Sequence, residues 1–213
     1  MIVLAGTIGA GKSSLAKALG EHLHTDVFYE AVDNNPVLDL YYQDPKKYAF
    51  LLQIYFLNKR FESIKQAYRQ DNNVLDRSIF EDELFLTLNY KNGNVTQTEL
   101  EIYKELLGNM LEELEGMPKK RPDLLVYIDV SFDTMLSRIQ QRGRSFEQIQ
   151  AQPELKAYYE QVHGEYPEWF DHYDVSPKLR IDGDKIDFVN NPSDLTNVLG
   201  QIDSELKKLE LIK

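Results

Sequence analysis

The stretch GTIGAGKS, residues 6–13, decides the fold of this 213-residue chain. It matches the pattern G-x-x-x-x-G-K-[S/T] at every fixed position. The apolar run from Ile2 to Ala5 before it predicts a buried strand, and apolar residues at helical spacing after it predict a helix. Glycines let backbone N–H groups turn toward phosphate oxygens, and the helix N-terminus adds partial positive charge. The sequence therefore predicts a loop that binds the phosphates of a nucleotide.

Two side chains of this loop have specific expected tasks. We expect Lys12 to reach the β- and γ-phosphates of ATP, and Ser13 to coordinate a Mg²⁺ ion that arrives with the nucleotide. A glycine-rich turn that binds nothing is the alternative, but the strand before the loop and the helix after it favour nucleotide binding. The expected ATP-binding residues of this segment are Gly6, Thr7, Ile8, Gly9, Ala10, Gly11, Lys12, Ser13 and Ser14.

Short apolar runs alternate with helical patterns along the rest of the chain. We expect further strands at 27–29, 74–75, 124–130 and 179–181, and helices at 13–22, 48–68, 79–90, 97–115, 132–141, 155–173 and 195–211. Pro167 is expected to interrupt the helix 155–173, and Asn34-Asn35-Pro36 indicates a turn. The alternation predicts one α/β domain over residues 1–213, with a five-stranded, mostly parallel sheet and helices on both faces.

Composition narrows the class of protein. The formal net charge of −11 argues against a nucleic-acid polymer as ligand. The most apolar stretch, residues 48–57, is too short to span a bilayer, so no membrane association is expected. The chain has no cysteine and begins with no signal-peptide pattern, which fits a cytoplasmic protein. Its four histidines show no metal-ligand spacing, so we expect no metal site built from protein alone.

Acidic residues lie at the carboxyl ends of three of the predicted strands, where ligands bind in open parallel sheets. Asp76 suits the carboxylate beside Mg²⁺ in a nucleotide site, and Arg77 next to it suits a clamp on a second carboxylate or a phosphate. Glu30 suits a base that takes the proton of an acceptor hydroxyl. For Asp129, an ordinary solvated carboxylate is an equally good interpretation.

Three arginines gather at the end of one predicted helix. Arg138 and Arg142 are four residues apart and share a helix face, and Gly143 ends the helix before Arg144. Three guanidinium groups in one place can neutralise the charge on a transferring phosphoryl group, which indicates a lid over the site. The alternative is a basic helix end favoured by the helix macrodipole.

A phosphate loop alone allows a kinase, a GTPase-like switch, or a motor or transport ATPase. The sequence lacks the Asn-Lys-x-Asp pattern that reads guanine, and 213 residues are too few for most ATPase machines. A kinase of a small molecule is therefore the favoured class. A nucleotide-binding regulator without catalysis would need the loop but not Glu30.

These motifs, in this order, resemble the deoxynucleoside kinase family, and above all its bacterial deoxyadenosine/deoxyguanosine kinases. The resemblance extends from Met1 to about Phe188. Asp76-Arg77-Ser78 is similar to the family's Glu/Asp-Arg-Ser motif, and residues 138–144 match its lid pattern R-x-x-x-R-G-R. Glu30 falls where the family has its catalytic base, although Ala31 replaces the proline that commonly follows it.

The resemblance implies an arginine-rich lid and a set of substrate-binding residues. Tyr42 and Glu160 fall where the family holds the sugar 3′-hydroxyl, and Gln53 falls where an amide reads the base. Arg60 and Asp82 match a pair that senses the base. The implied substrate-binding residues are Glu30, Tyr42, Gln53, Arg60, Arg77, Asp82 and Glu160, and Asp187 with Phe188 resembles the segment that holds the adenine of ATP.

The implied reaction transfers the γ-phosphate of ATP to the 5′-hydroxyl of a deoxynucleoside. Gln pairs with adenine, Arg suits guanine, and an ionised Asp needs a donor on the base, so purines are expected first, cytosine next and thymine last. The implied catalytic residues are Lys12, Glu30, Arg77, Arg138, Arg142 and Arg144, with Ser13 and Asp76 at Mg²⁺. A nucleoside monophosphate kinase of the thymidylate kinase type is the alternative.

The resemblance also implies assembly and regulation. The family is usually dimeric through helices outside the nucleotide site, and the stretch 79–115 is the expected interface. A homodimer and a heterodimer with a paralogous chain are both open. Feedback by a deoxynucleoside triphosphate is a further implication.

Overall fold

A five-stranded sheet forms the centre of the molecule. The computed structural model describes residues 1–32, 35–116 and 121–212. The strand order is β2-β3-β1-β4-β5, and every pairing is parallel. The strands are β1 (Ile2–Ala5), β2 (Val27–Phe28), β3 (Val74–Asp76), β4 (Leu124–Asp129) and β5 (Lys178–Asp182). The predicted α/β class and parallel sheet are confirmed.

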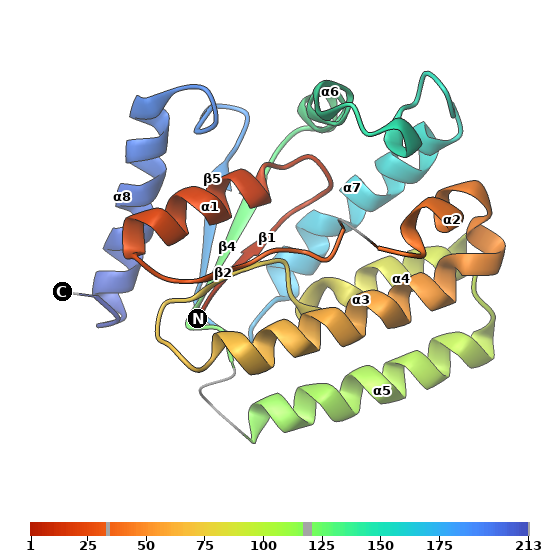
Figure 1. Ribbon diagram of the computed structural model, residues 1–213, viewed down its shortest axis with the longest axis horizontal. Coiled ribbons are helices and arrows are strands. Elements are labelled where there is room, and N and C mark those ends of the chain that lie inside the picture. The colour runs from red at the N-terminus through yellow and green to blue at the C-terminus, as the bar shows by residue number, and fades with distance from the viewer. Residues whose placement is uncertain (33–34, 117–120, 213) are drawn as a thin grey trace.

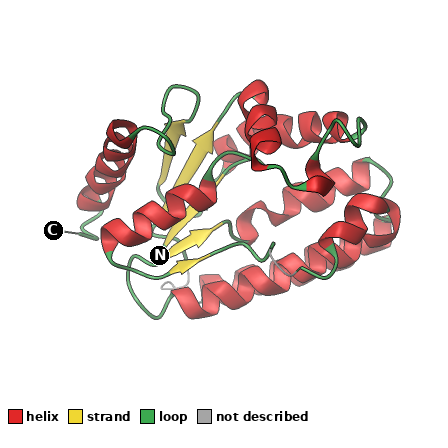
Figure 2. Cartoon of the chain, turned by 45° about the horizontal axis from the view of Figure 1, so that its top comes forward, coloured by secondary structure: helices red, strands yellow, loops and turns green. Residues whose placement is uncertain are grey.

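Helices cover both faces of this sheet, so the buried strands are apolar on both sides. Side chains alternate along β1: Ile2 and Leu4 join one core cluster, and Val3 and Ala5 join the other. Figures 1 and 2 show the strands as one twisted layer between two groups of helices.

The first core cluster packs against α1 (Lys12–Leu23), α6 (Phe132–Arg142) and α8 (Pro192–Lys208). The second packs against α3 (Pro45–Ala67), α4 (Asp82–Lys91), α5 (Gln97–Glu115) and α7 (Leu155–His172). Shorter elements are α2 (Leu38–Gln43), η1 (Ile79–Glu81) and η3 (Ser145–Glu147). In Figure 1, α5 lies outermost, below α3 and α4.

Several predicted helices differ from the observed ones, and the differences in α7 and α3 have a clear physical reason. α7 runs through Pro167, so the predicted interruption is wrong. Proline removes one N–H and crowds the preceding turn, but Tyr166 and Phe170, on either side of it, both stack on Tyr127 of β4 and anchor the helix to the sheet. α3 begins at Pro45, three residues before the prediction, because Asp44 caps it by accepting a hydrogen bond from the Lys47 amide.

The predicted turn at Asn34-Asn35-Pro36 falls partly outside the described residues, which omit 33–34. Among the described residues, the helices are too short or too polar for any of them to cross a membrane.

Candidate active site

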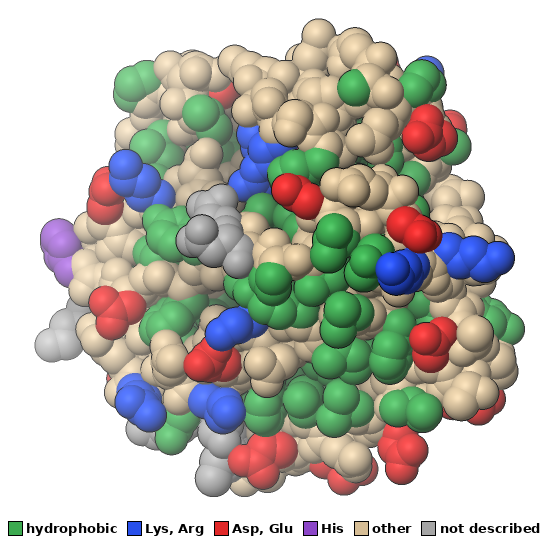
Figure 3. Space-filling view, turned by 45° about the vertical axis from the view of Figure 1, so that its right-hand side comes forward, with side chains coloured by type: hydrophobic (Ala, Val, Ile, Leu, Met, Phe, Trp, Pro, Cys, Tyr) green, Lys and Arg blue, Asp and Glu red, His purple; other side chains and the backbone are tan. Residues whose placement is uncertain are grey.

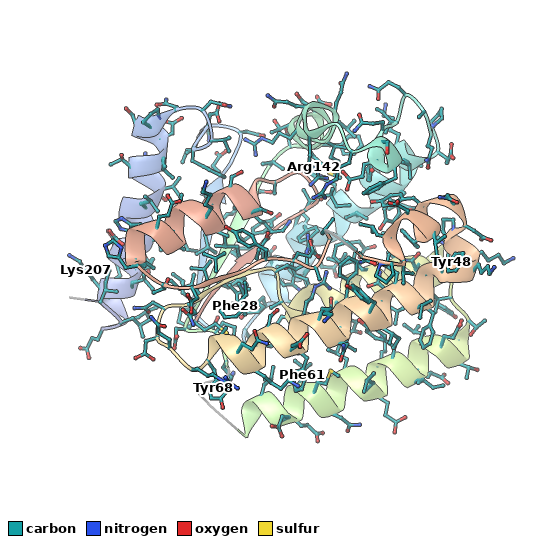
Figure 4. The ribbon with its side chains drawn as sticks, viewed as in Figure 1. Phe28, Tyr48, Phe61, Tyr68, Arg142 and Lys207 are labelled. Carbon is teal, nitrogen blue, oxygen red and sulfur yellow. The ribbon has the colours of Figure 1, made fainter. Side chains whose placement is uncertain are left out.

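A cavity of about 550 Å³ opens beyond the carboxyl ends of the strands. The phosphate loop and Asp187 bound one end, and α2 and α3 bound the other. Arg142, the last residue of α6 and labelled in Figure 4, lines this cavity. This position is the one expected for ligands of an open parallel sheet.

The phosphate loop has the backbone conformation that its glycines allow. Gly6 has φ 143°, and a Cβ there would lie 2.7 Å from the carbonyl oxygen of Ile128. Gly11 has φ 101° and directly precedes α1. The cavity is lined by Ile8, Gly9, Gly11, Lys12, Ser13 and Ser14, whereas Gly6, Thr7 and Ala10 are buried behind them. The loop therefore presents a helix N-terminus and backbone amides to the cavity.

Lys12 is buried at the start of α1. Its Nζ donates hydrogen bonds to the carbonyl oxygens of Gly6, at 2.8 Å, and Thr7, at 2.9 Å. Burial, assisted by the charge of Arg77, lowers the pKa of Lys12 to about 8. A phosphate in the cavity would offer this amine a charged partner in place of two carbonyls.

Ser13 and Asp76 meet below the loop. The Ser13 hydroxyl donates to Oδ2 of Asp76 at 2.5 Å, while Oδ1 of Asp76 is buried and has no hydrogen-bond partner. Burial raises the pKa of Asp76, and the charge of Glu30 adds to this effect. An uncompensated carboxylate oxygen beside a hydroxyl suits a hard cation such as Mg²⁺, whose other ligands would come from phosphates and water. The described residues include no group of three or more His, Asp or Glu arranged for a metal.

Glu30 follows β2, the edge strand of the sheet. Its side chain lines the cavity between the phosphate-loop end and the α3 end. Its Oε1 is 3.1 Å from Nε of Arg77 and also accepts a hydrogen bond from Arg60. Burial favours the neutral acid, but the charges of Arg77, Arg60 and Lys12 outweigh it and lower the pKa of Glu30 to about 2. The carboxylate is therefore ionised at any working pH.

Gln53 and Arg60 project from α3 into the cavity, and both are buried. Arg60 forms an ion pair with Asp82, and its guanidinium lies 4.7 Å from the ring centre of Phe56. Asp82 is fully buried and does not line the cavity, whereas its partner Arg60 does. The structure therefore brings together the three residues expected to read a base.

Tyr42 also lines the cavity, but Glu160 does not. On α7, Tyr158 faces the cavity, Tyr159 is buried, and Glu160 is exposed on the far side. Each residue turns a helix by 100°, so two positions beyond Tyr158 the side chain points away. The carboxylate beside Tyr42 belongs instead to Glu147 of η3, which is buried and lines the cavity. The placement of Glu160 in the site is wrong.

The three arginines at the end of α6 all line the cavity. Arg138 donates to the carbonyl oxygens of Ala10 and Gly183, each at 2.9 Å. Arg142 donates to Glu147 at 2.5 Å, and Arg144 lies 3.6 Å from the same carboxylate. Gly143, with φ 72°, turns the chain between them.

Asp187 and Phe188 have different positions. Asp187 lines the cavity and accepts hydrogen bonds from the backbone and side chain of Asn190. Phe188 is buried, and a Cβ at Gly11 would lie 3.0 Å from its ring, so it supports the loop from behind. Asp129 lies outside the cavity and pairs with Arg180, which favours its structural interpretation.

Several residues of this site were not predicted from the sequence. Tyr41 and Tyr158 line the cavity, and Glu81 and Tyr166 lie buried beneath it against Arg77. Glu147 follows Arg144 by three residues, and this spacing is the one sequence signal that pointed to it. The others come from α2, α7 and η1, and no local pattern indicates that these segments meet.

A phosphate loop, joined through an ionised carboxylate to a pocket with an amide and a buried ion pair, defines a P-loop kinase of a small hydroxyl-bearing acceptor. A family model described as deoxynucleoside kinase matches residues 2–207, and the chain belongs to that family. Its deoxynucleoside kinase activity, predicted from the sequence, is therefore confirmed, and the monophosphate kinase alternative is not supported.

Curated relatives and solved structures agree. The chain is 57% identical to a deoxyguanosine kinase of Lactobacillus johnsonii, over 98% of this chain and 93% of the relative. It is 53% identical to a deoxyadenosine kinase of Lactobacillus acidophilus, over 98% of this chain and 97% of the relative. A structure of M. mycoides deoxyadenosine kinase with bound dATP superimposes with a TM-score of 0.78 at 32% identity, covering 95% of this chain and 98% of that one.

Proposed function

We propose that this kinase uses ATP to phosphorylate the 5′-hydroxyl of purine deoxynucleosides, with Glu30 as the base. The observation that carries the proposal is the position of the Glu30 carboxylate, between Arg77 on the phosphate side and Arg60 on the acceptor side. A 5′-hydroxyl placed beside it would point at the γ-phosphate held by Lys12.

The residues divide the work of the reaction. Glu30 accepts the hydrogen bond of the hydroxyl and takes its proton as the new P–O bond forms. Arg77 keeps that carboxylate in place, and Lys12 with the arginines of α6 offsets negative charge on the transferring group. Ser13 and Asp76 would hold Mg²⁺, which would supply further charge neutralisation.

The pocket beyond Glu30 supports a purine as the base. The Gln53 amide both donates and accepts, which matches the edge of adenine, and Arg60 presents donors that match guanine O6 and N7. Relatives at 57% and 53% identity act on deoxyguanosine and deoxyadenosine. Deoxycytidine is a weaker candidate, since a relative at 34% identity is a deoxyadenosine/deoxycytidine kinase.

The sugar would lie between α2 and η3. We propose that Tyr42 and Glu147 hold the 3′-hydroxyl, because both line the cavity and Glu147 is a buried acceptor. Arg142 and Arg144 both pair with Glu147. Binding of substrate would separate Glu147 from the two arginines. Glu147 would then accept a hydrogen bond from the sugar hydroxyl, and the arginines would contact the phosphoryl group. Residues 138–147 would then act as a lid.

We also propose a place for the adenine of ATP. Asp187 and Asn190 line the cavity at the phosphate-loop end, where the adenine of ATP would sit.

A dimer is supported by exposed apolar side chains on neighbouring helices, Leu51 on α3 and Ile102 and Leu106 on α5. Figure 3 shows hydrophobic side chains gathered on this side of the molecule. We place the enzyme in the cytoplasm, where ATP is available.

The experiment is a phosphate-transfer assay with ATP and Mg²⁺. Each of the four deoxynucleosides is offered, and their monophosphates are tested in parallel. We expect deoxyguanosine and deoxyadenosine to be phosphorylated and the monophosphates to be inert. Glu30→Gln should lower kcat by about 10²- to 10⁴-fold and leave ATP binding intact. Turnover of pyrimidines in preference to purines would contradict the assigned base pocket.

A further inference from the structure

A buried carboxylate that the reaction does not use lies directly beneath the site. Glu81, the last residue of η1, is only 1% exposed, and one of its oxygens, Oε1, has no hydrogen-bond partner. Burying a carboxylate is costly unless it is paired. The groups around the other oxygen, Oε2, must therefore offset the cost of burying the Glu81 carboxylate.

Oε2 of Glu81 collects three donors. Nη1 of Arg77 lies at 2.8 Å, the Tyr166 hydroxyl at 2.7 Å, and the Gly6 amide of the phosphate loop at 3.4 Å. Nη1 of Arg77 also donates to the Tyr166 hydroxyl at 2.6 Å. Arg77, Glu81 and Tyr166 thus form a closed triangle of hydrogen bonds in the protein interior.

The same guanidinium connects the two halves of the active site. Nη2 of Arg77 donates to the carbonyl oxygen of Gly6 at 3.0 Å, and Nε lies 3.1 Å from Oε1 of Glu30. A guanidinium is planar and rigid, so fixing Nη1 in the triangle also fixes the directions of Nη2 and Nε. The position of the Glu30 carboxylate relative to the phosphate loop then depends on Glu81 and Tyr166.

The backbone of Arg77 supports this interpretation. Arg77 has φ 73°, a left-handed conformation that costs free energy for a residue with a side chain. Such a conformation persists where surrounding contacts over-determine it. Here the Arg77 amide donates to the Leu4 carbonyl at 3.0 Å, and the guanidinium makes the contacts described above.

We infer that Glu81 and Tyr166 are positioning residues that set the catalytic carboxylate of Glu30 against the phosphate loop through Arg77. Glu81 also shares the charge of Arg77. Without it, Arg77 would neutralise Glu30 alone and make that carboxylate a weaker acceptor for the hydroxyl proton. This inference rests on the proposed role of Glu30 as the base.

The test is a double-mutant cycle on the rate of a single turnover at saturating ATP and deoxyguanosine. Glu81→Gln should lower that rate by about tenfold to a hundredfold, because a displaced reacting group loses about that much. In a Glu30→Gln background the same change should cost less than about threefold, since the group being positioned is already gone. Tyr166→Phe, which changes no charge, should cost less than Glu81→Gln and show the same coupling.

The controls separate positioning from folding. Glu83→Gln, an isosteric change two residues along at an exposed position, should behave as the unmodified enzyme does. Binding of ATP and the melting temperature are measured for each variant. If Glu81→Gln does not fold, the Tyr166→Phe cycle alone decides the question. An equal loss in both backgrounds, or no loss, overturns the inference and leaves the kinase function intact. An unmodified enzyme that phosphorylates no deoxynucleoside would instead overturn the proposed function.

Discussion

The hydroxyl of Ser13 lies 2.5 Å from Oδ2 of Asp76, although 63 residues separate them in the chain. Ser13 stands in the first turn of α1, and Asp76 ends β3, the strand beside β1. The parallel pairing of β1 and β3 brings the two oxygens together at the carboxyl edge of the sheet. In the proposed function, a metal ion and the phosphates of ATP would meet at this contact.

Asp76→Asn should raise the Mg²⁺ concentration needed for half-maximal turnover by at least about tenfold, which corresponds to about 1.4 kcal/mol. The change removes the negative charge that attracts the ion but keeps an acceptor for Ser13. Initial rates over a range of free Mg²⁺ at fixed ATP measure it. Asp129→Asn is the matched control, because Asp129 ends β4, two strands away from β3 and outside the cavity, and should leave the Mg²⁺ dependence unchanged.

Gln53→Leu should reduce kcat/KM for deoxyadenosine and deoxyguanosine by about 5- to 150-fold, equivalent to the 1–3 kcal/mol of a bidentate base contact. The KM for ATP should stay the same, since Gln53 is at the acceptor end of the cavity. Steady-state kinetics with each substrate varied in turn measure both. Gln66→Leu, an exposed change on the same helix, serves as control. A loss confined to the KM for ATP would count against the assigned base pocket.

Binding of Mg²⁺·ATP should take up close to one proton per molecule at pH 9 and few protons at pH 7. The pKa of Lys12 is about 8 in the structure, so most Lys12 amines are neutral at pH 9 before nucleotide is added. Phosphates hold the amine in its charged form and so draw in a proton. Titration calorimetry in two buffers of different ionisation heat measures the uptake. Lys12→Arg stays charged and should abolish it.

The lowered pKa of Lys12 also affects the stability of the protein. Between pH 8 and its ordinary value of 10.5, the folded chain binds fewer protons at this group than the unfolded chain does. The contribution of Lys12 to the free energy of unfolding therefore rises with pH across that window. A contribution of Lys12 that decreased between pH 8 and 10.5 would contradict a lowered pKa for this group.

Two helical glycines should respond in opposite ways to alanine. A Cβ at Gly20 of α1 would lie 2.2 Å from Cγ2 of Val27, so Gly20→Ala should destabilise the protein by about 1–3 kcal/mol. Gly200 of α8 has open space around it, and Gly200→Ala should stabilise by about 0.5–1 kcal/mol. Urea unfolding curves of the two variants measure both changes. If both substitutions changed the free energy of unfolding in the same direction, helix propensity and not packing would determine the effect.

Ile102→Glu should convert a dimer to a monomer. Ile102 is 53% exposed on α5, and a carboxylate in an apolar interface would be buried without a partner. Light scattering coupled to size-exclusion chromatography measures the mass in solution. Thr196→Glu, an exposed position on α8, is the control. An unmodified enzyme that stays monomeric at high concentration would rule out this assembly.

The sequence by itself determined the features that depend on local chemistry. The phosphate loop needs glycines at positive φ, a lysine and a hydroxyl at fixed spacing, so residues 6–13 predicted it correctly. Alternating strand and helix patterns predicted the parallel sheet, because parallel strands require helical crossovers. Strand ends that converge at one edge also made Asp76 and Glu30 recognisable as candidates.

Only the tertiary structure decided which distant side chains meet. Glu147 and not Glu160 lines the cavity, because the rotation of α7 about its axis is set by packing of Tyr159 and Tyr166 in the core. Pro167 leaves α7 unbroken for a related reason, since contacts across the helix outweigh one lost hydrogen bond. Arg77 and Tyr166 are 89 residues apart. No local spacing encodes such a contact, because it exists only once two layers of the fold have packed.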